Sequence, residues 1–76
     1  MWYVYILRCS DNTLYTGITN DLEKRIRKHN EGKGAKYTRG RGPVTLVKSF
    51  EWPTKSGALK EEHRIKKLSR QEKLEL

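Results

Sequence analysis

The chain has few residues that could cross-link it or anchor it in a membrane. Cys9 is the only cysteine, so there is no internal disulfide and no cysteine-based zinc site, and the two histidines, His29 and His63, lie far apart in the sequence. No hydrophobic run approaches the roughly 20 residues that cross a bilayer, and no signal-peptide pattern opens the chain. We therefore expect a soluble, cytoplasmic protein without a membrane partner, with Cys9 as a small buried residue.

Acidic residues are scarce relative to basic ones. The 76 residues include 17 Lys and Arg against nine Asp and Glu, which gives a net charge of +8, and basic residues crowd positions 24 to 41. The positive electrostatic potential that results favours a polyanionic partner, above all nucleic acid. A chain of this length buries one small core, and no repeat or linker divides it, so residues 1–76 should form a single domain.

Two stretches rich in aromatic and β-branched residues, 2–7 and 13–18, predict a β-hairpin closed by Ser10-Asp11-Asn12. The sequence then predicts a helix from Asp21, a long glycine-rich surface loop over 32–42, a third strand over 44–50, a helix over 55–68 and a short helix after a capping box at Ser69. The fold class is α+β, with helices flanking a small three-stranded antiparallel sheet.

The hairpin register places two tyrosines together. A turn at residues 10–12 sets Tyr5 opposite Gly17 and puts Tyr15 diagonally across from Tyr5 on the same face. Gly17 would then leave room over the strand for a phosphate. A slip of one residue would send the tyrosines to opposite faces.

The first predicted helix begins with Asn20 as N-cap and Glu23 as an approximate capping box. Arg25 borders an apolar stripe that is formed by Leu22, Ile26 and His29. A guanidinium and an imidazole beside a strand tyrosine could make a phosphate-handling site. Helix patterning alone more often means a solvated basic face, so this alternative stays open.

The second helix places a carboxylate among apolar residues. Glu62 shares a face with Ala58 and Ile65, where a charge needs a partner or a cation, and Glu61 is a rival that pattern alone does not exclude. Either glutamate could also pair with a Lys or Arg at the rim.

The glycine-rich loop carries the cations Lys33, Lys36, Arg39 and Arg41, which could follow a nucleic-acid backbone while Tyr37 stacks on an exposed base. It lacks the order of a Walker loop. The alternative is a flexible, solvated connection.

These residues, taken in order, resemble the GIY-YIG nuclease superfamily over nearly the whole chain. Tyr3-Val4-Tyr5 stands where the superfamily has GIY, and Tyr15-Thr16-Gly17 where it has YIG. Arg25, His29 and Glu62 match its arginine, its histidine or tyrosine, and its metal-binding glutamate. The chain is most similar to small stand-alone bacterial members, and its 29–35 and 38–43 segments also resemble the structure-specific endonuclease branch that cuts branched DNA. It departs from the pattern at Tyr3, which replaces the first glycine.

The resemblance implies metal-dependent hydrolysis of phosphodiester bonds. Glu62 would hold one Mg²⁺ or Mn²⁺, and Arg25 would pin a phosphate oxygen. Tyr15 or Tyr5 would relay a proton from the attacking water, which requires its pKa to fall from about 10 beside a cation, and His29 would hydrogen-bond that tyrosine or accept a proton. The site further requires Arg25 and Glu62 to point at the face that carries the tyrosines.

The implied substrate is DNA in preference to RNA, branched or damaged, as in DNA repair. Characterised members commonly carry a separate DNA-targeting domain, and this chain shows none, so a protein partner would supply target specificity. Two other functions remain open: a nucleic-acid-binding module that uses the same basic face without cleavage, and an interaction protein whose nuclease-like fold serves a partner.

Overall fold

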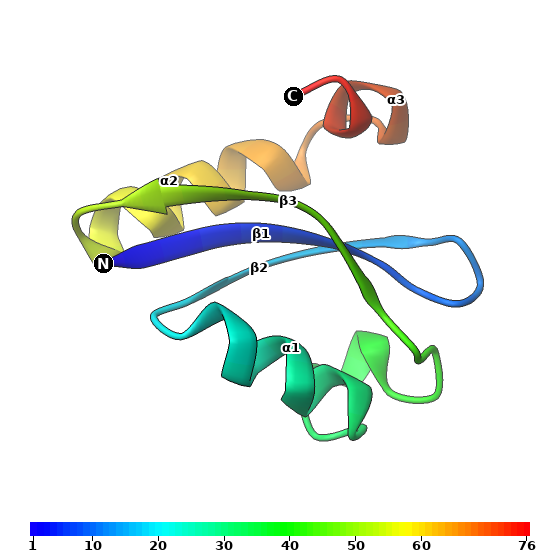
Figure 1. The fold of residues 1–76 in the computed structure, drawn as a ribbon. Coiled ribbons are helices and arrows are strands. Elements are labelled where there is room, and N and C mark those ends of the chain that lie inside the picture. The colour runs from blue at the N-terminus through cyan, green and yellow to red at the C-terminus, as the bar shows by residue number, and fades with distance from the viewer.

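The N-terminal strand forms the centre of the sheet, which has the order β2-β1-β3 with both pairings antiparallel. The computed structural model describes residues 1–76 (Figure 1). Its elements are β1 Trp2–Arg8, β2 Leu14–Thr19, α1 Leu22–Asn30, the 3₁₀-helix η1 Lys36–Thr38, β3 Thr45–Trp52, α2 Lys55–Lys66 and α3 Arg70–Leu74. The predicted α+β class and three-stranded sheet are confirmed.

The predicted hairpin register is also confirmed. Tyr5 pairs with Gly17 and Leu7 with Tyr15, and the amide of Cys9 donates to the carbonyl of Thr13 at 2.8 Å. The turn is closed by Asn12, which adopts a left-handed φ of 69° that asparagine tolerates better than most residues.

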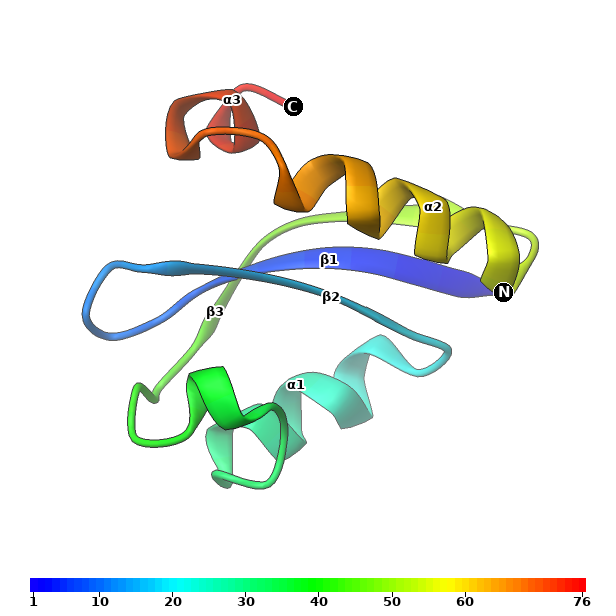
Figure 2. The same ribbon diagram turned by 180° about the vertical axis from the view of Figure 1, so that it is seen from behind.

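Helices cover both faces of the sheet. α1 lies on one face and α2 on the other, as Figure 1 and the reverse view in Figure 2 show. Because β1 is central and covered on both sides, all four residues from Val4 to Leu7 are buried. Val4 and Ile6 join Ala58 and Ile65 of α2 in one core cluster, and the other cluster forms beneath α1 from Tyr5, Leu7, Cys9 and Val44. The predicted burial of Cys9 is confirmed.

The predicted start of the first helix is wrong by one residue. The N-cap is Asp21, whose carboxylate accepts the backbone amide of Lys24 at 3.2 Å, and not Asn20. The hydroxyl of Thr19 accepts the amide of Asp21 at 3.0 Å and so keeps Asp21 extended, which delays the first helical turn. The capping box with Glu23 therefore does not form. The box at Ser69 does form, with both reciprocal hydrogen bonds.

The segment over 32–42 was predicted to be free of regular structure, and this is wrong for three residues. η1 forms because the hydroxyl of Thr38 donates to the carbonyl of Ala35 at 3.0 Å, while backbone bonds link Arg39 to Lys36 and Arg41 to Thr38. Smaller differences concern the ends of elements: β3 runs two residues further than predicted and α2 ends two residues earlier. None of the helices has the length and apolar character needed to cross a membrane.

Candidate active site

A buried chain of hydrogen bonds connects β1, α1 and η1. The hydroxyl of Tyr5 lies 2.9 Å from Nε2 of His29, and Nδ1 of the same ring lies 2.7 Å from the hydroxyl of Thr38. Tyr5 is fully buried, and His29 and Thr38 are each 1% exposed. His29 reaches this position because it lies on the apolar stripe of α1 that packs on the sheet, as its spacing from Leu22 and Ile26 predicted.

One tautomer of His29 satisfies the short hydrogen bonds around its ring best. The single proton of the Thr38 hydroxyl is used on the carbonyl of Ala35, so this oxygen accepts the proton on Nδ1 of His29. Nε2 is then free of a proton and accepts the hydroxyl of Tyr5. The amide of Ala35 is 3.5 Å from Nδ1, at the outer limit for a hydrogen bond, and does not compete. Burial, and after it the charge of Arg25, lowers the pKa of His29, which is therefore neutral at neutral pH.

Arg25 connects this buried chain to the surface. Its Nε donates to the hydroxyl of Tyr5 at 3.3 Å, and this bond is the main cause that raises the pKa of the guanidinium. Tyr15 is close enough to contribute to the same rise. A permanently charged, half-buried guanidinium beside two tyrosines is suited to hold a phosphate oxygen.

The pKa of Tyr5 differs from the sequence prediction. A proton relay was expected to have a lowered pKa, but burial raises the pKa of Tyr5, and this exceeds the lowering by the hydrogen bond from Arg25. Tyr5 is thus a neutral hydrogen-bond donor to His29, without access to solvent. Tyr15 is partly exposed, with its ring centroid 6.4 Å from that of Tyr5 and 5.3 Å from that of His29.

Tyr37 and Arg41 close the site on the side of η1. The ring of Tyr37 stacks on that of Tyr15, with centroids 5.8 Å apart and an interplanar angle of 27°, and the guanidinium of Arg41 lies over the Tyr37 ring, 4.5 Å from its centroid. Arg41 also pairs with Asp11 of the hairpin turn at 2.5 Å. Tyr37 is 44% exposed despite these contacts. Lys33, Lys36 and Arg39 remain exposed and outside the ion pairs of the structure.

Two glycines are required by the packing around Tyr5 and His29. A Cβ on Gly17 would lie 2.6 Å from the hydroxyl oxygen of Tyr5, so the phenol of Tyr5 fills the space over β2. The sequence had suggested that this space would hold a phosphate. A Cβ on Gly34 would lie 2.4 Å from Nδ1 of His29. The backbone of the loop therefore rests directly on the imidazole.

Glu62 is placed differently from the other site residues. It lies on α2, whose buried residues Ala58 and Ile65 pack with Val4 and Ile6 on the face of the sheet opposite to Tyr5 and Leu7. The expectation that the Arg25 and Glu62 side chains point at one face stays a prediction. Its carboxylate pairs with Lys66 at 3.4 Å and is 17% exposed, and its charge is among the causes that raise the pKa of Tyr5. Because α2 also contacts the edge strand β2, Glu62 and Arg25 can face a common ligand only around that edge.

The geometry has a counterpart in known proteins. Residues 1–75 match the family described as the GIY-YIG catalytic domain. The chain belongs to the GIY-YIG family. It is 60% identical to the UPF0213 protein OB0043 of Oceanobacillus iheyensis, over 97% of this chain and 86% of that protein, and 60% identical to the UPF0213 protein CPE1444 of Clostridium perfringens, over 100% and 82%.

Solved structures of GIY-YIG relatives have the same fold. The solution NMR structure of the UPF0213 protein BH0048 from Bacillus halodurans is 54% identical, covers 96% of this chain and 79% of its own, and superposes with a TM-score of 0.59. That of the protein EF2693 from E. faecalis is 41% identical over 96% and 78%, with a TM-score of 0.65. The three-stranded sheet with its helices is therefore the GIY-YIG fold.

Sequence reasoning missed two residues of this candidate site, Thr38 and Gly34. Both lie in the segment interpreted as a surface loop, and they contact His29, which precedes Thr38 by nine residues and Gly34 by five. A local signal for Thr38 does exist, because a threonine three residues after Ala35 can bond back to its carbonyl and start a turn. No local signal indicates that this turn packs on an imidazole.

Proposed function

We propose that the protein is a metal-dependent endonuclease that hydrolyses phosphodiester bonds in DNA. The observation that carries this proposal is the guanidinium of Arg25, held by Tyr5 and the buried His29 beside the accessible Tyr15. A cation fixed in this way neutralises charge that develops on a phosphate without having to reorganise. A surface that only binds nucleic acid does not need this buried support for one arginine.

In this proposal the two tyrosines have different roles. Tyr15, which is partly exposed, relays the proton of the attacking water. Tyr5 is buried and donates to His29 while it accepts from Arg25, so it positions the arginine, and His29 holds Tyr5 in that orientation. His29 stays neutral because its pKa is lowered, and its Nε2, free of a proton, is available to take the hydroxyl proton of Tyr5 when Tyr5 receives one from the reaction.

Glu62 is the carboxylate that would hold a divalent ion. The structure has no group of three or more His, Cys, Asp or Glu side chains suited to a metal. One carboxylate does fit Mg²⁺ or Mn²⁺, which keep several waters and bind through one or two carboxylates together with substrate phosphate. Its partner Lys66 lies at the surface, 3.4 Å away, and can move aside. Bound there, the ion would act as a Lewis acid on a phosphate oxygen.

The substrate is proposed to be DNA that is branched or damaged, with a protein partner supplying target specificity and with a cytoplasmic location. The net charge of +8 supports a polyanionic substrate. Lys33, Lys36 and Arg39 are exposed cations that can contact its backbone. Arg41 and Tyr37 are proposed to support this segment, because their mutual contact and the pair with Asp11 tie it to the hairpin.

The test is cleavage of labelled duplex, flap, junction and single-stranded DNA and RNA with Mg²⁺, with Mn²⁺ and with chelator. Glu62→Gln and Arg25→Ala should each reduce the rate by at least about 100-fold, the scale of losing a metal ligand or a transition-state charge partner. Glu61→Gln is the matched control, since Glu61 neighbours Glu62 on α2, is similarly buried and has its own pair with Arg64.

Two results would contradict the proposal. Cleavage that persists in chelator or in Glu62→Gln would exclude the metal role of this residue. Absence of cleavage on every substrate, combined with salt-dependent binding, would favour the second candidate, a nucleic-acid-binding module. The basic surface over α1 and η1 is the observation that favours this second function.

A further inference from the structure

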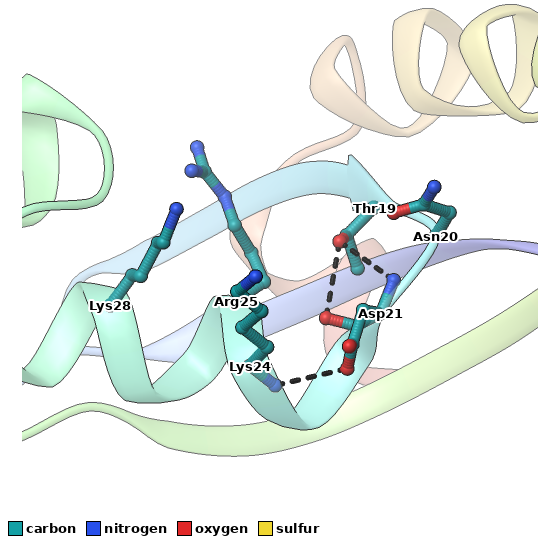
Figure 3. A pocket seen from close by; sticks show the side chains of 6 residues that line it. All are labelled: Thr19, Asn20, Asp21, Lys24, Arg25 and Lys28. Atoms are coloured by element: carbon teal, nitrogen blue, oxygen red, sulfur yellow. Dashed lines mark hydrogen bonds between the residues drawn. The ribbon is translucent and has the colours of Figure 1, made fainter.

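A polar pocket of about 220 Å³ lies at the start of α1, next to Arg25 (Figure 3). The last residue of β2, the two residues that follow it and three cations of α1 line it: Thr19, Asn20, Asp21, Lys24, Arg25 and Lys28. No hydrophobic residue takes part. A lining of this kind can recognise an anion, but it offers no hydrophobic or aromatic side chain for a nucleobase.

The three cations have no carboxylate partner in the fold. None of the ion pairs in the structure includes Lys24, Arg25 or Lys28. Lys24 stands in the first turn of α1, where the helix dipole disfavours a positive charge, and Lys28 adds a like charge one turn further on. An anion between them would relieve both unfavourable terms.

The single acidic group of the lining is already engaged. The carboxylate of Asp21 accepts the backbone amide of Lys24 as the helix cap, and the Thr19 hydroxyl bonds to the amide and the carbonyl of Asp21. These bonds hold the turn in place beside the lysines. Asn20 adds an exposed carboxamide at the rim of the pocket, which can donate to an anion.

We propose that this pocket binds a phosphodiester of the nucleic-acid strand next to the one that is cut. Arg25 belongs to both places, since it lines the pocket and its Nε donates to Tyr5. Lys24 and Lys28 hold one phosphate and thereby fix the strand, so that the neighbouring phosphate meets the guanidinium and Tyr15. The inference rests on the proposed function for the place of the cut, whereas the binding itself needs no cleavage.

The first test measures affinity in chelator, where the strand stays intact. Fluorescence anisotropy with labelled single-stranded and duplex DNA is recorded against salt for Lys24→Ala/Lys28→Ala. We expect Kd to rise about tenfold at low salt and the log-log slope to fall by about 0.7 for single-stranded DNA and about 0.9 for duplex DNA, the change for one lost phosphate contact. The loss should be equal for unrelated sequences, because the pocket reads only backbone.

The matched control is Arg27→Ala/Lys60→Ala, which removes the same charge from exposed helix positions outside the pocket. If this control lowers the affinity and the slope as much as the pocket pair does, the pocket is only part of the general positive field and the inference is overturned. Amide NMR spectra establish that both pairs are folded.

The second test identifies the source of the phosphate. Amide shifts of residues 19–28 are followed while inorganic phosphate, or an oligonucleotide of about six residues, is added to the wild-type protein. We expect the oligonucleotide to saturate these shifts at a concentration at least tenfold lower. Saturation by inorganic phosphate at the same concentration would make free phosphate the ligand and would refute a site for strands.

Failure of the inference can be told apart from failure of the proposed function. If the wild-type protein cleaves DNA and Lys24→Ala/Lys28→Ala binds and cleaves like the control variant, the pocket is excluded as a binding site and the nuclease function stands. If binding is tight and depends on Lys24 and Lys28 but no substrate is cleaved, the nuclease function is excluded. The pocket is then a site where a nucleic-acid-binding module contacts the backbone.

Discussion

Replacing Thr38 by valine tests the hydrogen-bond chain behind the candidate site. Valine has nearly the shape of threonine and lacks only the hydroxyl, which in the wild-type protein accepts from His29 and donates to Ala35. Because His29 is 1% exposed, water does not replace the lost partner of its Nδ1. The perturbation is therefore a buried N–H without an acceptor.

The expected loss follows from this burial. A buried donor left unsatisfied costs about 1–3 kcal/mol, and for a domain of this size each kcal/mol lowers the midpoint of thermal unfolding by about 4–8 °C. The lost free energy is at the lower end of this range if the proton of His29 moves to Nε2. Nδ1 then accepts a hydrogen bond from the amide of Ala35, which lies 3.5 Å away in the wild-type protein. In that tautomer Nε2 donates to Tyr5, and the direction of the bond to the phenol reverses.

Two measurements separate these outcomes. Urea unfolding, followed by the fluorescence of Trp2 and Trp52, gives the free energy, and the ¹⁵N shifts of the imidazole give the tautomer. Thr38→Ser keeps the hydroxyl and should keep the proton on Nδ1, while it loses about 1 kcal/mol for a methyl group. Wild-type stability in Thr38→Val, together with an unchanged tautomer, would refute the chain described here.

Two further predictions concern the same cluster. Gly17→Ala should lower the free energy of unfolding by about 1–3 kcal/mol, because its Cβ overlaps the phenol of Tyr5, whereas Gly42→Ala, with its nearest contacts at 4.0 Å, should be tolerated; equal stability of the two variants would contradict the packing. Stability should decrease as the pH falls from about 7 to 5.5, because the lowered pKa of His29 means that the unfolded chain takes up this proton, below about pH 6.5, before the folded one does. NMR titration of the His29 ring checks this directly, and a midpoint at or above about 6.5 would contradict it.

The sequence by itself determined the local structure of this protein. The unbroken run in β1, the turn at residues 10–12 and the period of two fixed the hairpin register, so the pairing of Tyr5 with Gly17 followed without coordinates. The apolar spacing of α1 likewise turned His29 toward the sheet. These features depend on neighbours within a few residues or on the period of one element, and both can be read from a sequence.

The tertiary structure alone decided how these elements form a site. Which face α2 covers depends on packing between Ala58, Ile65 and the sheet, and α2 lies on the face opposite to that of Tyr5. The chain from Tyr5 through His29 to Thr38 joins residues 24 and nine positions apart, and the raised pKa of Tyr5 is mainly the result of its burial. Desolvation and the direction of hydrogen bonds depend on all the groups that pack around a residue, and this environment cannot be derived from sequence spacing.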